Sequence, residues 1–317
     1  FFGITVPVNE KSTFALSMAA AGGMNTEYKT NFGDGTTLID KLTKETGLNL
    51  EQVYLTGTFG RKLNKDTSAG VSIIYAYQRF EATGLGIFGK FPNTVVDDTK
   101  LTNNGIDESS GVGYKIGVQT GTTNFRLGFS YQPRIKMSKF QKYSSLFANQ
   151  GEFDIPPVIN AGFAWTISKF TLAFDYQNIN YEDIETFSNS ISKFTDEGKL
   201  FGSSNGPGFG WRSIDVYKLG FEYQYSDDWT FRTGWNKGDN PVQKGEVSLA
   251  FLAPAIITDH FTFGYTNKLS DSSSYSMNYV HSFKNTMTDE FSPTFGGGTI
   301  TIEMEQKALE FGYTKIF

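Results

Sequence analysis

Apolar and polar residues alternate strictly along much of this chain. Between Val216 and Ser226 every second residue is apolar or aromatic, and the residues between are polar or glycine. Successive side chains of a β-strand point to opposite faces of a sheet, so this period predicts strands with one apolar and one polar face. The pattern gives about thirteen strands, near residues 2–8, 12–22, 48–62, 67–83, 112–121, 124–138, 156–167, 170–181, 215–226, 229–236, 259–268, 273–284 and 299–317.

Short and long connections between these strands alternate without exception. Short ones fall at 9–11, 64–66, 122–123, 168–169, 227–228 and 269–272, and long ones around 23–47, 84–111, 139–155, 182–214, 237–258 and 285–298. All tight turns therefore lie at one end of the sheet. A soluble sandwich would mix loop lengths through its Greek-key crossings, whereas short turns, long loops and an aromatic face are typical of bacterial outer-membrane barrels. We expect an all-β fold, a transmembrane antiparallel up-and-down β-barrel.

The two ends of the chain complicate the strand count. Bacterial single-chain barrels have even numbers of strands, yet the strand near 2–8 already runs from the loop end to the first short turn. We therefore expect thirteen strands of a fourteen-stranded parent, a single outer-membrane domain over 1–317 that is incomplete at its N-terminus. Phe1 opens directly into strand-like sequence without a signal peptide, as in a mature, trimmed or incomplete chain.

The last predicted strand carries two apolar sets of opposite parity. Leu309, Phe311, Tyr313 and Phe317 share one face, and an aromatic final residue is usual in outer-membrane barrels. Three further apolar residues lie on the other face: Ile300, Ile302 and Met304. We expect either a bulge near 305–307 or an upper half that projects beyond the membrane.

Composition excludes several classes of protein. There is no cysteine and there are only two histidines among 317 residues, which leaves no disulfide, thiolate zinc site or cysteine nucleophile. No stretch approaches the roughly 18 apolar residues of a membrane-spanning helix. The net charge of −5 is opposite in sign to a nucleic-acid-binding footprint. We expect no enzyme, cofactor, metal site or nucleic-acid partner.

Several stretches are similar to a known family. The most specific is DVYKLGFEYQYSDDWTFRTGWNKGDNPV (215–242), where a strand, an acidic turn and a second strand precede Asn240-Pro241-Val242. Residues 2–29, 156–183 and 307–317 are similar too. Together they resemble the FadL/OmpP1/TodX family, outer-membrane transporters for long-chain fatty acids and aromatic hydrocarbons. Family members begin with a plug-like hatch carrying an Asn-Pro-Ala motif and a first strand, and neither is present here.

The resemblance implies a transport route for hydrophobic cargo. Ligand is captured in an apolar groove among the extracellular loops, bound inside the barrel, and released sideways through a kink in the family's third strand. That strand is Ser12–Gly23 here, and Gly22 and Gly23 are the kink candidates, since paired glycines tolerate unusual backbone angles. The alternative is an ordinary strand end that runs into a flexible loop. The family's cationic site residues have Arg79 and Arg212 as their nearest equivalents.

Two loops contain apolar residues where solvent-facing sequence is normally polar. These candidate groove residues are Leu85, Ile87, Phe88, Phe91, Leu146 and Phe147. Exposed apolar clusters often mark binding surfaces. Alternatively, the residues pack against one another and hold the loops over the barrel mouth. Two loop segments could form short helices, around 38–42 and 184–194.

Cations on the polar, inward faces of the strands are candidates for binding a carboxylate. They are Lys115, Arg126, Lys218 and Arg232, with Arg79 near the top of its strand. Arginine binds carboxylates in a bidentate way, and shelter from bulk water strengthens the pairing. The alternative is a salt-bridge network within the lumen that involves Asp175 and Glu222.

We therefore expect outer-membrane transport of hydrophobic molecules by a monomer in contact with outer-membrane lipid and lipopolysaccharide. A general diffusion porin for hydrophilic solutes is the alternative, and it would need a charged constriction loop in an open lumen. A lipid hydrolase that uses His281 is disfavoured, because this histidine lies at the outward parity of its strand. The sequence does not distinguish a fatty-acid cargo from an aromatic one.

Overall fold

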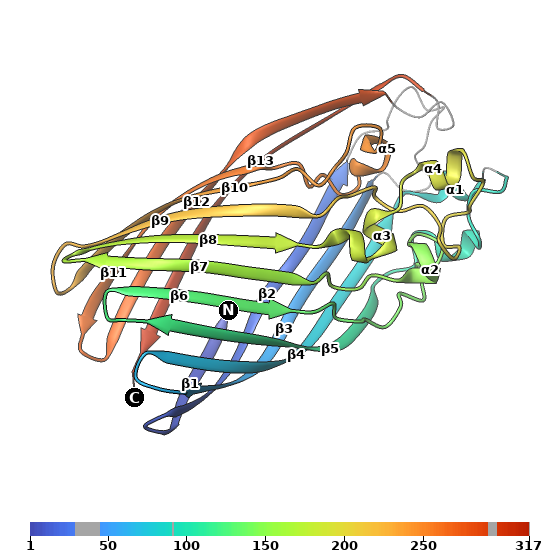
Figure 1. Cartoon of the computed structure of the whole chain (residues 1–317). Coiled ribbons are helices and arrows are strands. Elements are labelled where there is room, and N and C mark those ends of the chain that lie inside the picture. The colour runs from blue at the N-terminus through green and yellow to red at the C-terminus, as the bar shows by residue number, and fades with distance from the viewer. Residues whose placement is uncertain (29–44, 91, 291–296, 317) are drawn as a thin grey trace.

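The structure is a computed structural model that describes residues 1–28, 45–90, 92–290 and 297–316. These residues form one 13-stranded antiparallel sheet in which each strand pairs with its neighbours in sequence, and the sheet curves into a barrel wall (Figure 1). The strands are β1 (Phe2–Asn9), β2 (Ser12–Tyr28), β3 (Thr46–Lys62), β4 (Thr67–Thr83), β5 (Asp107–Gly121), β6 (Phe125–Gln132), β7 (Val158–Ile167), β8 (Phe170–Ile179), β9 (Ile214–Gln224), β10 (Trp229–Gly238), β11 (Asp259–Ser270), β12 (Ser273–Glu290) and β13 (Thr299–Lys315).

The long loops gather at one end of the wall and the short turns at the other. The described helices are α1 (Gly86–Lys90), α2 (Ala148–Gly151), α3 (Glu185–Ser188), α4 (Ser192–Thr195) and α5 (Val247–Ala250), with short 3-10 turns at η1 (Asp98–Lys100) and η2 (Tyr181–Asp183), all at the loop end (Figure 1). Within the described part of the chain, no helix has the length and apolar character needed to cross a membrane.

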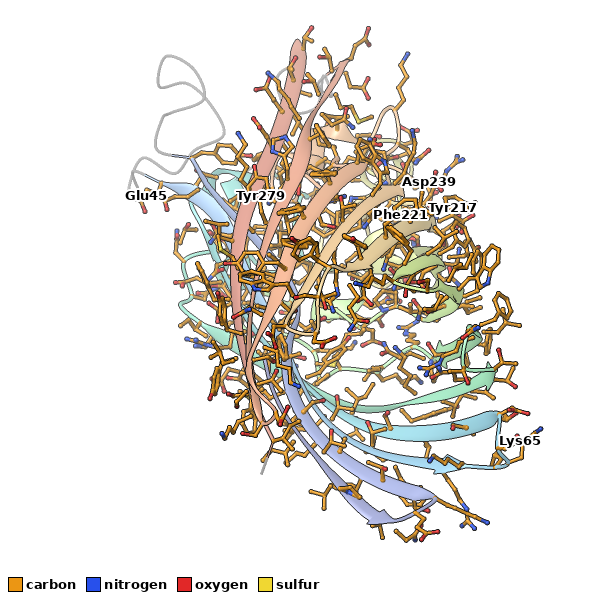
Figure 2. The ribbon with its side chains drawn as sticks, turned by 90° about the vertical axis from the view of Figure 1, so that its left-hand side faces the viewer. Glu45, Lys65, Tyr217, Phe221, Asp239 and Tyr279 are labelled. Carbon is orange, nitrogen blue, oxygen red and sulfur yellow. The ribbon has the colours of Figure 1, made fainter. Side chains whose placement is uncertain are left out.

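The strand order and the alternation of connections are confirmed. The turns after β1, β3, β5, β7, β9 and β11 are all short, the longest being 63–66 and 225–228. Glu45 and Lys65, on either side of β3, lie at opposite ends of the wall (Figure 2). The helix expected over 184–194 is split into α3 and α4, and the one expected at 38–42 lies outside the described residues.

Some strand ends differ from the sequence prediction. β2 continues to Tyr28 and β12 to Glu290, and β5 begins earlier, at Asp107. β6 instead stops at Gln132, because residues 133–157 leave the wall and fold across its inner face. The wall is therefore tall along β2 to β5 and β12 to β13, and short along β6 to β10 (Figure 1).

The apolar side of the wall changes from outside to inside between the two ends. On β4, Val71 and Ile73 near the turn end point outward and are 44% and 59% exposed. Phe80 and Ala82 near the loop end point inward and are fully buried. Alternation along a strand permits this change when apolar residues occupy the outer positions below and the inner positions above.

In β2 the same change needs an extra residue. Ala20 pairs with Val53 and Gly22 with Gln52, so Ala21 has no opposite residue in β3 and forms a β-bulge. The bulge reverses which residues face inward. Met18 below it points outward, whereas Met24 and Tyr28 above it pack inside the barrel mouth. Tyr28 donates a hydrogen bond to the Phe251 carbonyl.

The last strand pair has a corresponding bulge, but on the other strand. Ser282 pairs with Gln306 and Asn285 with Met304, so the extra residue lies in β12, opposite Glu305. The bulge expected near 305–307 is therefore present at that place, with its extra residue in β12, and a projection of the upper half beyond the membrane stays a prediction. β13 keeps one parity throughout, and its apolar upper residues Ile300, Ile302 and Met304 pack against the core at the barrel mouth.

The loops form this core themselves. We call it the loop core: buried side chains of the long loops packed against the upper strand halves. The Phe80 ring contacts Phe140, Tyr143 and Phe147, with centroids 5.4, 4.9 and 4.9 Å away. From Phe147 the aromatic contacts continue through Phe153 to Phe187 in the next long loop. Such pairs contribute about 0.5–1.5 kcal/mol each beyond the burial of their area.

A smaller apolar cluster lies beneath the loop core, where residues 133–157 meet β4 and β5. Ile135 and Met137 pack against Ile74 and Ala76. Glycines in β5 make this approach feasible: a Cβ on Gly113 would lie 2.4 Å from a side-chain carbon of Ile135. We call this group the lower cluster.

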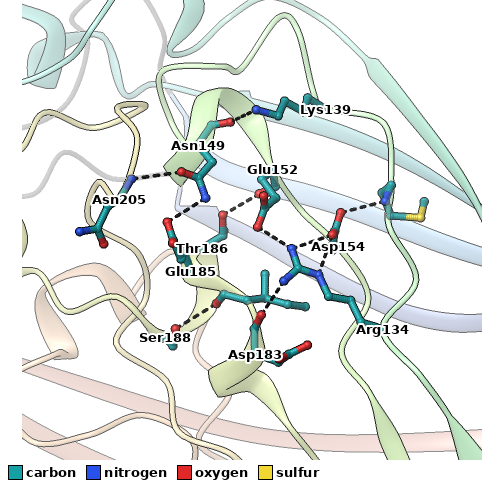
Figure 3. Close-up of polar contacts among 12 residues, drawn as sticks. Arg134, Lys139, Asn149, Glu152, Asp154, Asp183, Glu185, Thr186, Ser188 and Asn205 are labelled. Carbon is teal, nitrogen blue, oxygen red and sulfur yellow. Dashed lines mark hydrogen bonds and ion pairs between the residues drawn. The ribbon is translucent and has the colours of Figure 1, made fainter.

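A polar clasp joins two of the long loops (Figure 3). Arg134 Nε and Nη2 donate to Asp154 and Glu152 at 2.8 Å, and Nη1 donates to the Asp183 carbonyl at 2.6 Å. Burial alone would lower the pKa of the guanidinium, but its hydrogen bond to Asp154 and the nearby carboxylates raise that pKa above its ordinary value. Asp154 also accepts a hydrogen bond from the backbone of Met137, so the clasp fixes the inward segment as well.

Replacing Arg134 by methionine should open the loops. Arg134→Met leaves Asp154, 5% exposed, without its cation, a change that costs on the order of 3 kcal/mol. Because cleavage follows the population of the open form, proteinase K should cut residues 133–157 about 10- to 100-fold faster in the detergent-folded protein. Mass spectrometry locates the cuts. Arg61→Met, at the exposed turn end of β3, is the matched control. Equal cleavage of both variants would show that the clasp does not hold the loops.

Candidate functional site

Below the loop core and lower cluster the barrel is hollow. A cavity of about 710 Å³ is lined by the inner faces of β3 to β8, and a second of about 440 Å³ by β8 to β11. Both include Ala173 and Asp175, so they are adjoining parts of one lumen. Glycines contribute much of the inner wall: Gly60, Gly70, Gly117, Gly128, Gly162, Gly220 and Gly234. The space exists because these inward positions carry no side chain.

Four of the predicted cations do line the lumen. Lys115 and Arg126 lie in the larger cavity, and Lys218 and Arg232 in the smaller one. Arg232 forms the salt bridge considered from the sequence, with Nε 2.7 Å from Glu222, and Nη1 donates to Thr266. Lys218 donates to the Gln177 amide oxygen.

Lys115 and Arg126 differ from these two, whose side chains are hydrogen-bonded. Neither side chain has an ion pair or a hydrogen bond among the described residues, although both lie on the wall of the larger cavity. Asp175, in the same cavity, lies flat over Gly162, where a Cβ would be 2.0 Å from its carboxylate oxygen. The larger cavity therefore contains the two cations that are free to receive an anionic group.

Arg79 and Arg212 do not line the two lumen cavities. The inner positions of β4 are even-numbered, so Arg79 points outward beside Tyr75 and Tyr77 and pairs with Glu51 at 3.4 Å. An inward Arg79 was therefore the wrong expectation. Arg212 is exposed in the loop before β9, where its backbone N–H donates to the Pro241 carbonyl. The predicted cations do not form one group.

The candidate groove residues are packed rather than exposed. Leu85, Phe88 and Phe147 are buried in the loop core, and Leu146 is half-buried against it. Phe91 and the side chain of Ile87 lie outside the described residues. Two cavities of about 30 and 20 Å³ remain in the loop core, and Leu146, Phe201, Leu249 and Leu252 line both. Such spaces hold about one or two water molecules, so a larger ligand must separate these side chains.

Part of the loop core was not foreseen from the sequence. Residues 247–256 read VSLAFLAPAI, an apolar run inside a long loop, and most of its side chains are buried. Hydropathy alone contained this signal, but the alternation used to find strands does not detect it. Phe140, Phe153, Phe201 and Phe209 were single aromatics in polar surroundings, and only the fold brings them together.

The kink candidates lie at the bulge of β2. Gly22 faces the lumen, where its Cβ position is 3.1 Å from Gln52 Oε1, and Gly23 pairs with the outward Glu51. Hydrogen bonding to β3 continues on both sides of the bulge. Among the described residues, no group of three or more His, Asp or Glu is placed to hold a metal ion.

Comparisons with known proteins identify relatives. A family model described as "Outer membrane protein transport protein (OMPP1/FadL/TodX)" matches residues 1–315. Long-chain fatty acid transport proteins of Salmonella typhi and Escherichia coli K12 are both 25% identical, over 278 and 288 residues. The aligned parts cover 77% of this chain but 60% and 61% of those proteins, so the chain spans about three fifths of their length.

Solved structures show the same fold. The P. putida toluene transporter TodX matches with a TM-score of 0.68 and 14% identity, covering 99% of this chain and 82% of that one. A Pseudomonas aeruginosa FadL homologue matches with a TM-score of 0.69 and 16% identity, covering 99% and 77%. Together with the family match, these findings show that the chain belongs to the OMPP1/FadL/TodX family of bacterial outer-membrane β-barrel proteins, which are transport proteins and not enzymes.

Proposed function

We propose that this protein carries hydrophobic small molecules across the outer membrane, with the loop core as the capture site. The observation that carries the proposal is an apolar core of loops directly above a hollow lumen. Removing apolar surface from water is favourable by about 25 cal/mol per Å², so a hydrocarbon gains by entering such a core. The small cavities around Leu146 mark places where the packing is incomplete.

The loop core also argues against the general porin. A porin needs an open aqueous path past a charged constriction, and here apolar side chains occupy the barrel mouth. Residues 133–157 do fold inward as a constriction loop would. Yet they present Ile135 and Met137 to the wall, and Arg134 is engaged by the clasp.

Lateral release is the second part of the proposal. The β2 bulge is flanked by small residues, Ala19 to Gly23, and the Cβ position of Gly22 has the Gln52 side chain as its nearest neighbour. A bulge weakens a ladder locally and bends its strand. Cargo leaves the barrel interior at this position, between the loop core and the lumen, and enters the bilayer. Exposed outer residues such as Tyr217 and Phe221 contact lipid and lipopolysaccharide (Figure 2).

Cargo with a carboxylate would use the lumen cations. The relatives named above include transporters of long-chain fatty acids and of toluene, and only the former ligand is an anion. Lys115 and Arg126 are the lumen cations whose side chains have neither an ion pair nor a hydrogen bond in the described structure, so they form the carboxylate site of the proposal, with Lys218 and Arg232 in support. The protein acts as a monomer, since all thirteen strands of the described wall come from one chain.

Polarity in the loop core should reduce capture. Leu146→Gln introduces an amide between apolar side chains, and we expect saturable toluene binding to weaken about tenfold in equilibrium dialysis of the detergent-purified protein. Leu63→Gln, exposed at a short turn, is the matched control. Equal toluene binding by both variants, or swelling of proteoliposomes in hydrophilic sugars, would contradict capture by the loop core and favour the porin.

A larger side chain at the bulge should slow release without affecting capture. Gly22→Leu places a branched side chain against Gln52, whereas Gly60→Leu, on the inner face of β3, meets no atom within 4 Å of its Cβ. We expect about tenfold slower uptake of radiolabelled toluene by cells producing Gly22→Leu, with unchanged binding in detergent. Unchanged uptake would remove the lateral route from the proposal.

Removing a free lumen cation should distinguish anionic from neutral cargo. Loss of a hydrogen bond to a charged group costs about 1.5–3 kcal/mol, so Arg126→Gln should weaken decanoate binding about 10- to 100-fold at neutral pH. Toluene binding should not change. Arg61→Gln, exposed at the turn end of β3, is the control. If decanoate binds both variants alike, the lumen cations stabilise the barrel wall and do not bind the cargo.

A further inference from the structure

Gln78 is a buried amide without hydrogen bonds. Its side chain lies on the inner face of β4 and is completely buried. Neither Nε2 nor Oε1 has a hydrogen-bond partner among the described residues. Nearly all buried polar groups in proteins are paired, because an unpaired one has lost its water without compensation. An amide in this state needs a reason to be retained where a methionine or leucine would fit.

The position of Gln78 along β4 supplies a reason to retain this amide. The inner face of this strand runs from Ser72 in the lumen cavity, through Ile74 and Ala76 in the lower cluster, to Gln78. Phe80 follows, already in the loop core. Ser72 and Gln78 are about 20 Å apart at a rise of roughly 3.3 Å per residue. Gln78 therefore separates two apolar clusters on the line between the loop core and the lumen.

The neighbouring strands extend this polar position sideways. Gln78 pairs with Gln52 of β3 on one side and with Ser109 of β5 on the other. The Ser109 hydroxyl is already engaged by the Ser138 carbonyl. Gln52 reaches the opposite way, toward Gly22 at the β2 bulge. A row of neutral hydrogen-bonding groups thus leads from Gln78 to that bulge.

The chemistry of the site indicates what it binds. The charged residues next to Gln78 and Gln52, Arg79 and Glu51, point to the outer face, and the inner positions of β4 on either side of the amide belong to apolar clusters. A primary amide presents a donor and an acceptor side by side. Its complement is a neutral O–H group, which donates to Oε1 and accepts from Nε2. An ionised carboxylate would fit poorly, since it cannot donate and is costly to place in apolar surroundings.

We propose that Gln78 binds the uncharged O–H group of an otherwise apolar ligand as it passes from the loop core to the lumen. The ligand is a phenol or the protonated form of a carboxylic acid. This inference rests on the proposed function and adds to it a preference among hydrophobic molecules. Gln78 holds the ligand with its polar end beside the bulge, and the apolar remainder lies among the side chains of the two clusters.

The test compares two ligands that differ by one hydroxyl. Equilibrium dialysis of the detergent-purified protein measures dissociation constants for p-cresol and toluene, with empty micelles as the partition blank. Gln78→Met keeps the side-chain shape and removes both hydrogen bonds. We expect p-cresol binding to weaken about three- to tenfold while toluene binding is unchanged. Gln224→Met, exposed at the end of β9, should leave both constants as in the unmodified protein.

Decanoic acid distinguishes the two sources of the O–H group. If protonated acids use the site, Gln78→Met weakens decanoic acid binding below the carboxyl pKa and has no effect at neutral pH. Thermal unfolding of Gln78→Met should occur at an equal or higher temperature, so weaker p-cresol binding cannot be ascribed to misfolding.

Two results would overturn the inference. If Gln78→Met changes p-cresol and toluene binding by the same factor, or changes neither, the amide is satisfied by water and does not select ligands. That result leaves capture of hydrocarbons intact. If the unmodified protein binds neither ligand, the proposed function itself is wrong, and the inference that rests on it is wrong too.

Discussion

The packing of the long loops into the barrel mouth is the constraint on which the rest of the structure depends. The turn end of the wall must be apolar outside, as Ile73 is, and the loop end must be apolar inside, as Phe80 is. Strands β3 and β4 meet both demands by ordinary alternation, with apolar residues at outer positions below and inner positions above. β2 cannot, because its apolar residues keep one parity from Phe14 to Tyr28, so the extra residue Ala21 turns its upper half inward. The bulge therefore has a structural role whatever passes beside it.

Two kinds of contact hold the loop core, and they respond differently to a ligand. Aromatic contacts such as those of Phe80 are individually small and non-directional, so neighbouring rings can separate and pack again around an apolar guest. The Arg134 clasp is directional and charged, and breaking it leaves the buried Asp154 carboxylate without its cation. Capture is thus expected to separate side chains around Leu146 while the clasp keeps the loops attached to one another. The small cavity beside Leu146 and the ion pairs of Arg134 agree with these two different responses.

The sequence predicted what is local and periodic, and it failed where alternation alone does not tell the inner face of a strand from the outer one. Strand order and turn alternation follow from a two-residue period that every strand shows on its own. Arg79 could not be oriented, because upper β4 has large side chains on both faces, Tyr77 outside and Phe80 inside. Ile302 faces inward by the alternation of β13 itself, but the apolar residues above and below Glu305 have opposite parity, so the sequence did not show which set faces inward. Leu85 and Phe88 were recognised as unusual, but whether such residues bind a ligand or each other is a tertiary question.

The inner face of β4 orders the environments that a passing molecule meets, and this order has a consequence for selectivity. The apolar loop core comes first, then the Gln78 amide, and the free cations Lys115 and Arg126 come last, in the lumen. A charged group entering this sequence must lose its water long before it reaches a counter-ion, so it is opposed at the entrance however strongly the lumen attracts it. A molecule that is neutral at the mouth and can ionise in the lumen avoids that cost. The arrangement therefore favours cargo according to the charge it carries on entry, and the cations below act only on molecules that the loop core has already admitted.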